Sequence, residues 1–145
     1  KDVIIRQRVN QYVFRTMILN NYNGQCAITG INDSRLLNAS HIIPWSERKD
    51  TRLNPENGIC LSDLYDKAFD KGLITIRPDD YTIMISPSLR DNLTRDVFAV
   101  HFGKIENRKI ENKKRIANLM MKYAILLNFI SSSDELNTQE LEISP

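Results

Sequence analysis

One central segment of the sequence contains three residues with complementary chemistry: His41, Asn57 and Asp66. A neutral imidazole can take a proton from water, an amide can hold that imidazole in one orientation, and a carboxylate can bind a hard divalent cation. Metal-assisted hydrolysis of a phosphodiester needs an activated water on one side of phosphorus and charge neutralisation of the leaving oxygen on the other. These residue types predict a small phosphodiester-cleaving site, provided that the elements carrying them converge.

Each of the three residues also has a purely structural explanation. A single histidine in an apolar strand is usually a hydrogen-bonded core residue, and an asparagine before glycine suits a turn. Asp63 and Asp66 share a helix face on which carboxylates can simply complement the N-terminal dipole. Residue type alone does not decide between these alternatives.

Apolar periodicity and turn-forming residues indicate which elements carry these side chains. The first element is an amphipathic helix over residues 4–22, which ends near Gly24. We expect the apolar residues that recur at near-helical spacing in this helix to face the core: Ile5, Val9, Tyr12, Val13 and Ile18.

Two strands and a short helix are expected at the centre of the chain. Residues 35–43 predict a strand, and a polar loop over residues 46–58 separates it from a second strand. Ser62 is expected to cap a short helix that ends at Gly72. If the two strands pair and this helix packs across them, the three polar side chains converge.

The remaining elements complete an α+β fold. Residues 73–76 and 81–85 alternate as a β-hairpin, and residues 113–130 repeat apolar residues at helical spacing. We expect one domain over residues 1–131, followed by an acidic, disordered tail over residues 132–145.

The formal net charge of +2 conceals an uneven distribution. All the charged residues of the tail are acidic, so the body of the chain is basic, and residues 101–115 hold six Lys or Arg against two Glu. Such clusters suit the phosphates of nucleic acids. The alternative is a solvated helix face.

The length of 145 residues suits one compact domain. No apolar run approaches the roughly 18 residues that span a bilayer, and the N-terminus lacks the layout of a signal peptide, so we expect a cytoplasmic protein without membrane contact. Cys26 and Cys60 lack CxxC spacing, and we expect both to be reduced and packed. Lys1 in place of Met indicates trimmed upstream sequence, although a removed tag or a disordered arm would look the same.

Four stretches of the sequence together resemble the HNH endonucleases with the ββα-metal site, in the branch found in bacterial restriction endonucleases: CAITG, LLNASHIIPW, RLNPENGICLS and YDKAFDKGLITI. The resemblance covers residues 6–90 and implies a ββα-metal core at residues 24–76, flanked by an N-terminal helix, a second β-hairpin and a C-terminal helix. It also implies that His41 is the general base and that Asn57 orients it. Asp66 falls where a second histidine usually ligates the metal, which makes this an H-N-D variant.

Two features depart from the family pattern. Ser40 stands where many HNH sites have an aspartate ligand, and its neutral hydroxyl is a weaker ligand for Mg²⁺. Asp66 supplies a negative oxygen, which suits Mg²⁺ or Mn²⁺ better than a nitrogen-preferring ion, and Asp63 is a further, weaker candidate ligand. We expect one divalent ion, Mg²⁺ or Mn²⁺, and no structural zinc, because the CxxC pairs of the zinc-knuckle versions are missing.

The resemblance implies a metal-dependent DNA endonuclease, the catalytic domain of a restriction-type enzyme in bacterial defence. The basic residues expected to contact DNA are Arg48, Lys49, Arg52 and Lys67, with a salt bridge as the structural alternative for Arg52. Cutting both strands calls for a homodimer or two sequential nicks, and target choice calls for a recognition domain N-terminal to this chain. The alternatives are a catalytically degenerate HNH module that binds nucleic acid or a protein partner, and an enzyme that cleaves RNA.

Overall fold

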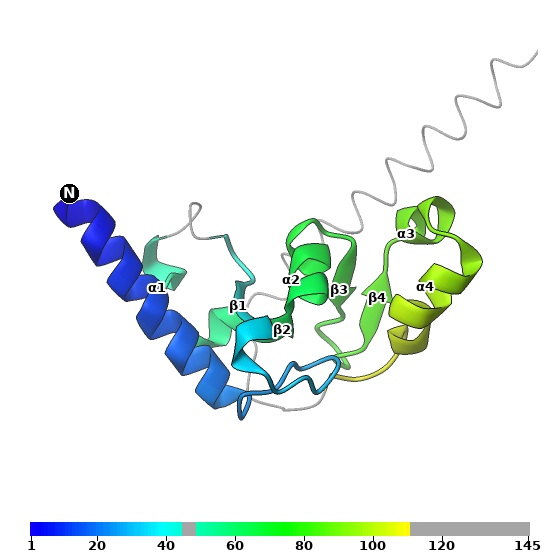
Figure 1. The fold of residues 1–145 in the computed structure, drawn as a ribbon, viewed down its shortest axis with the longest axis horizontal. Coiled ribbons are helices and arrows are strands. Elements are labelled where there is room, and N and C mark those ends of the chain that lie inside the picture. The colour runs from blue at the N-terminus through cyan, green and yellow to red at the C-terminus, as the bar shows by residue number, and fades with distance from the viewer. Residues whose placement is uncertain (45–48, 111–145) are drawn as a thin grey trace, which may run out of the picture.

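The computed structural model describes residues 1–44 and 49–110. Its α-helices and β-strands are, in chain order (Figure 1), α1 (Asp2–Asn21), β1 (Leu37–His41), β2 (Gly58–Ser62), α2 (Asp63–Asp70), β3 (Ile74–Ile76), β4 (Ile83–Ile85), α3 (Pro87–Asn92) and α4 (Arg95–His101). These elements confirm the expected α+β class. The predicted helix over residues 113–130, the acidic tail and Arg48 lie outside the described residues. Within the described ranges, no helix combines the length and the apolar character that crossing a membrane requires.

The centre of the fold is an antiparallel pair of strands followed directly by a helix. β1 and β2 pair in a register that sets His41 opposite Gly58 and Leu37 opposite Ser62. Ser62 caps α2 without a side-chain hydrogen bond, and Gly72, at φ +69°, ends the helix in the left-handed conformation that glycine favours. The predicted strand pair and short helix are therefore confirmed, and α2 packs against β1.

The second β-hairpin is also confirmed, because β3 pairs antiparallel with β4. Beyond it lie α3 and α4, two short helices that the apolar periodicity did not indicate. Apolar side chains of both sheets, α2 and α4 form one continuous core. Tyr65 of α2 adds a polar link to α4, since its hydroxyl donates to the carbonyl of His101 at 2.6 Å.

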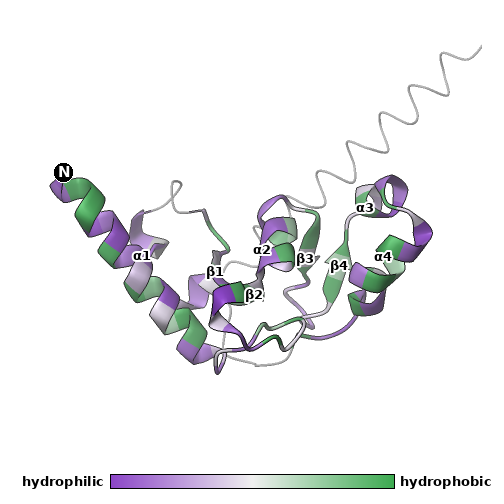
Figure 2. Ribbon diagram, in the orientation of Figure 1, coloured by the Kyte–Doolittle hydropathy of each residue, from purple (hydrophilic) through white to green (hydrophobic). Residues whose placement is uncertain are grey.

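The predicted core face of the N-terminal helix is wrong for four of its five residues. Ile18 is buried, but its partner in the core is Phe14. The exposed fraction is between 44 and 71 % for the other four: Ile5, Val9, Tyr12 and Val13. Length explains Ile5 and Val9, because the 20 residues of α1 extend about 30 Å, far beyond the five-residue strands of the sheet. Tyr12 and Val13 directly precede the buried Phe14 and therefore lie on other sides of the helix. Figure 1 shows the N-terminal half of α1 projecting past the sheet, and Figure 2 shows apolar and polar residues mixed along it.

The C-terminal half of α1 is held closely against β1 and β2. The guanidinium of Arg15 donates to the carbonyl of Leu37, the first residue of β1, at 2.6 Å and to the carbonyl of Ser34, just before β1, at 2.7 Å. A Cβ atom added to Gly58 of β2 would lie 2.5 Å from Cδ1 of Ile18 and 2.6 Å from Cζ of Phe14. Gly58 has an extended φ of −140°, which any residue adopts. Glycine is therefore required here because α1 approaches closely, and not because the backbone is strained.

Replacing Gly58 with alanine should lower the free energy of unfolding by about 1–3 kcal/mol, because the added methyl group overpacks a closed interface. Urea denaturation measures this loss. Gly103→Ala is the matched control, since its Cβ would have its nearest contact at 3.4 Å, an ordinary van der Waals distance. Equal losses in the two variants would contradict the role assigned to Gly58.

Candidate active site

His41 is the last residue of β1, and two contacts fix its imidazole. The ring stacks on the buried ring of Phe14, with centroids 3.8 Å apart and planes 14° apart. Its Nε2 atom lies 3.0 Å from the backbone carbonyl oxygen of Arg52. Burial lowers the pKa of His41 below its usual 6.5, and the hydrogen bond to the Arg52 carbonyl partly offsets this effect. The imidazole is therefore largely neutral at pH 7.

The contact with Arg52 also selects the tautomer of the neutral ring. A carbonyl oxygen can only accept a hydrogen bond, so Nε2 must carry the ring proton. The lone pair of the neutral imidazole is then on Nδ1. His41 thus has the protonation state and the fixed tautomer that a general base requires.

Asn57 is fully buried, and its side chain binds the backbone just beyond His41. The N–H of Ile43 donates to Oδ1 of Asn57 at 2.8 Å, and Nδ2 of Asn57 donates to the carbonyl of Ile43 at 3.2 Å. The N–H of Ile42 also donates to the backbone carbonyl of Asn57, at 2.9 Å. Asn57 therefore holds the chain segment that follows the catalytic candidate, and its role in orienting the imidazole stays a prediction.

Asp66 reaches the same region from α2. The hydroxyl of Ser40 in β1 donates to Oδ1 of Asp66 at 2.5 Å. Asp66 and His41 border one pocket of about 290 Å³ between α1, β1 and α2. The other residues that line this pocket are Gln11, Phe14, Arg15, Asn38 and Ala39. The structure thus brings the predicted base and the predicted ligand to one concave surface.

The donor set at this pocket fits a largely hydrated cation. Mg²⁺ in proteins is commonly held by one or two carboxylates, with water in its other positions. Asp66 supplies one carboxylate, beside the hydroxyl of Ser40. Among residues 1–44 and 49–110, no three His, Cys, Asp or Glu side chains are grouped closely enough to hold a metal ion. The pocket therefore suits an ion attached through Asp66 better than an ion enclosed by protein ligands.

The other predicted site residues lie outside this pocket. Asp63 accepts a hydrogen bond from an asparagine of β1 and borders a different pocket. Lys49 and Lys67 are exposed, and neither borders the pocket of His41. Arg52 is half-buried and reaches His41 through its backbone, so a phosphate contact by its guanidinium stays a prediction.

Two groups at the site were not predicted. Phe14 could have been found, because it lies one helical turn before Ile18 and the pair would have indicated the buried face of the helix. The contact of the Arg52 carbonyl with His41 could not have been predicted from the sequence, since every residue in the loop carries the same backbone group.

Residues 26–77 match the family model of HNH endonucleases. The matched stretch contains β1, β2, α2 and the three polar side chains His41, Asn57 and Asp66. No curated protein matches the chain. The family match and the ββα arrangement agree, and they support a nuclease-type hydrolase as the general class of this chain.

Proposed function

We propose that this chain is a metal-dependent DNA endonuclease in which His41 is the general base. The observation that carries the proposal is the pocket shared by His41 and Asp66, together with the carbonyl contact that leaves the lone pair on Nδ1 of His41. A histidine that served only as a core residue would not need a neighbouring carboxylate at a concave surface.

In this mechanism His41 takes a proton from water through Nδ1, and the water oxygen forms a bond to phosphorus. The imidazolium that results is stabilised because its hydrogen bond to the Arg52 carbonyl becomes charge-assisted. A divalent ion bound at Asp66 would supply charge neutralisation at the departing 3′-oxygen. The P–O3′ bond breaks, the 3′-oxygen takes a proton from solvent, and the products carry a 5′-phosphate and a 3′-hydroxyl.

The surrounding residues position the DNA and the reacting groups. Lys49, Arg52 and Lys67 are proposed to contact phosphates near the pocket, which orients the duplex but conveys no sequence information. We also propose that the domain is the catalytic part of a restriction-type enzyme, whose target is chosen by a separate recognition domain. Cleavage of both strands would then require a homodimer or two sequential nicks.

A plasmid assay tests this function. Supercoiled DNA, unmodified and methylated, is incubated with Mg²⁺, with Mn²⁺ or with EDTA, and the ends of the products are labelled. Metal-dependent nicking with 5′-phosphate ends is expected. Cleavage of RNA alone, or cleavage that EDTA does not stop, would contradict the proposal.

A catalytically degenerate module is the second candidate, and two observations favour it. The described residues lack a cluster of three metal-ligating side chains, and Ser40 replaces an acidic ligand of the family pattern. This candidate predicts DNA binding without nicking under every metal condition of the plasmid assay.

Replacing Phe14 with leucine should reduce kcat by roughly ten- to a hundred-fold with little change in KM, because a small displacement of a catalytic group is costly in rate. The stack that aligns His41 is lost, whereas the DNA contacts are kept. Steady-state kinetics on a short duplex separates the two constants. Phe69→Leu is the control, since Phe69 is an equally buried phenylalanine in α2; an equal fall in kcat there would show a general packing effect.

A further inference from the structure

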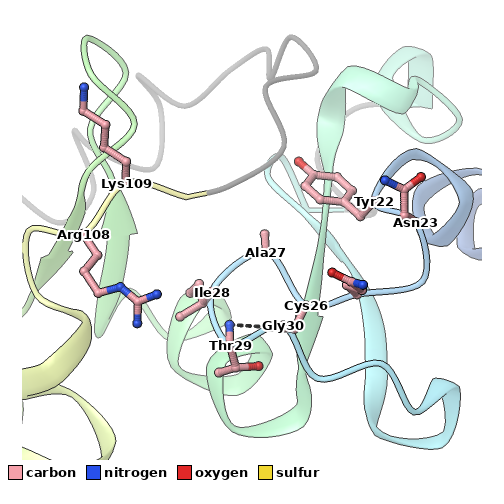
Figure 3. Close-up of a pocket in the computed structure, with 10 residues that line it drawn as sticks. Tyr22, Asn23, Cys26, Ala27, Ile28, Thr29, Gly30, Arg108 and Lys109 are labelled. Carbon is pink, nitrogen blue, oxygen red and sulfur yellow. Dashed lines mark hydrogen bonds between the residues drawn. The ribbon is translucent and has the colours of Figure 1, made fainter.

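A second pocket lies apart from the site of His41, and no residue lines both. Its volume is about 340 Å³, near the lower end of the range for small-ligand pockets. One wall is the turn that follows α1, residues 22–30, and the other is formed by Arg108 and Lys109 (Figure 3).

The polar side chains that line this pocket are rich in hydrogen-bond donors. Tyr22 is 4 % exposed and lines the pocket from the end of α1 (Figure 3). Burial raises the pKa of Tyr22, so the hydroxyl keeps its proton and can donate. Oγ1 of Thr29 accepts from the N–H of Ile31 at 3.2 Å, and the Thr29 side chain also hydrogen-bonds the Cys26 thiol, so Thr29 helps to fix the turn. Asn23 and Gln25 add amide groups, and no carboxylate is among the described lining residues.

The opposite wall adds positive charge. The guanidinium of Arg108 points toward the turn at Ile28 and Thr29 (Figure 3), and a guanidinium offers a fork of donors that matches two phosphate oxygens. The ammonium of Lys109 points away from the turn in this view. Its charge contributes to lowering the pKa of Asp80, although hydrogen bonds from Thr82 are the main cause of that shift. Arg108 is therefore the main cation of the pocket.

Both walls are tied to the core by backbone hydrogen bonds. The N–H of Ala27 donates to the carbonyl of Cys60 in β2 at 2.9 Å, and the N–H of Ile83 in β4 donates to the carbonyl of Arg108 at 2.9 Å. Lys109 also forms a β-bridge with Thr82. The pocket is thus largely formed before a ligand arrives, which lowers the entropic cost of binding.

We propose that this pocket binds a phosphate group, contributed by a DNA strand that continues beyond the cleavage point. The pocket offers hydrogen-bond donors and a guanidinium, and no carboxylate is among its described lining residues. Its volume admits a phosphate with its sugar. These properties match the chemistry of a nucleic acid backbone. The assignment to DNA rests on the proposed nuclease function, whereas phosphate binding itself does not. A free nucleotide or inorganic phosphate has the same chemistry and is the alternative source.

Binding of duplex DNA and of inorganic phosphate, measured separately, tests the proposal. Both are measured on the His41→Ala protein in EDTA, where cleavage cannot interfere, with further substitutions Arg108→Gln, Tyr22→Phe and, as a matched control, Arg95→Gln on α4. Fluorescence anisotropy over a salt series gives DNA affinity. Phosphate is titrated against the amide NMR signals of Thr29 and Gly30.

We expect Arg108→Gln to weaken DNA binding by roughly three- to ten-fold and to reduce the salt slope by about one, because one phosphate contact is lost. Tyr22→Phe should weaken binding without changing the slope, and Arg95→Gln should change neither the phosphate titration nor the signals of the turn. Loss of phosphate binding in both pocket variants with unchanged DNA affinity supports the pocket but assigns it to a free phosphate.

Two results overturn the proposal. One is unchanged binding of both DNA and phosphate in Arg108→Gln and Tyr22→Phe. The other is an equal loss in Arg95→Gln, which would show a diffuse effect of charge. Failure of the nuclease proposal would be seen separately, as absence of nicking by the unsubstituted protein while these binding differences persist.

Discussion

Replacing His41 with alanine should reduce the rate of DNA cleavage by roughly 10²–10⁴-fold, the usual contribution of a positioned general base. The loss should fall on kcat, because the DNA contacts proposed above do not involve the imidazole. The fold should persist, since His41 is only half-buried and the core beneath it is built from apolar residues of both sheets. Single-turnover cleavage and thermal unfolding of the same sample measure the two effects.

The chain provides its own control for this prediction, because its one other histidine, His101, is exposed at the end of α4. His101→Ala should cleave as the unsubstituted protein does. His41→Gln, which keeps more side-chain volume against Phe14, separates loss of the base from loss of packing. If His41→Ala unfolds and His41→Gln remains active, His41 is a core histidine and the proposed mechanism is wrong.

Replacing Asp66 with alanine should abolish metal-dependent cleavage, because the carboxylate that borders the pocket of His41 is removed. Asp66→His should keep part of the activity and shift the preference toward Mn²⁺, Co²⁺ or Ni²⁺, since imidazole suits these ions better than Mg²⁺. Titration of each metal against cleavage rate measures both effects. Asp63→Ala is the matched control, because Asp63 lies on the same helix but borders a different pocket. Asp66→Ala cutting as well as the unsubstituted protein at every metal concentration would disprove the ligand assignment.

A substitution of Ser40, whose hydroxyl donates a hydrogen bond to Asp66, tests the same ligand assignment in a second way. In Ser40→Asp the donated hydroxyl is replaced by a second carboxylate, so two like charges face each other until a cation neutralises them. This variant should bind metal more tightly than the unsubstituted protein and should be less stable without it. Thermal unfolding with and without Mn²⁺ measures the difference, and a stability that does not respond to Mn²⁺ would place the metal elsewhere.

Several elements of the fold follow from local sequence. Ser62 and Gly72 mark the two ends of α2, and the alternation of residues 73–85 marks the second hairpin; both predictions are confirmed. They were predictable because caps, turns and alternation act between residues a few positions apart. The polar types at positions 41, 57 and 66 likewise indicated a site, and β1 and α2 bring two of them to one pocket.

Other features depend on contacts between segments that are distant in the sequence, and only the tertiary structure determines those contacts. Apolar residues occur on several sides of α1, so periodicity did not identify Phe14 as the buried residue that stacks on His41. The sequence indicated Gly58 only as the end of a polar loop, whereas in the structure the absence of a side chain at Gly58 allows the close approach of α1. The carbonyl of Arg52 fixes the tautomer of His41, but this contact cannot be predicted from residue type, because every residue has a backbone carbonyl. Sequence by itself therefore determined the chemical types at the site, while long-range packing set their contacts, because backbone groups and steric fit become specific only when distant segments are brought together.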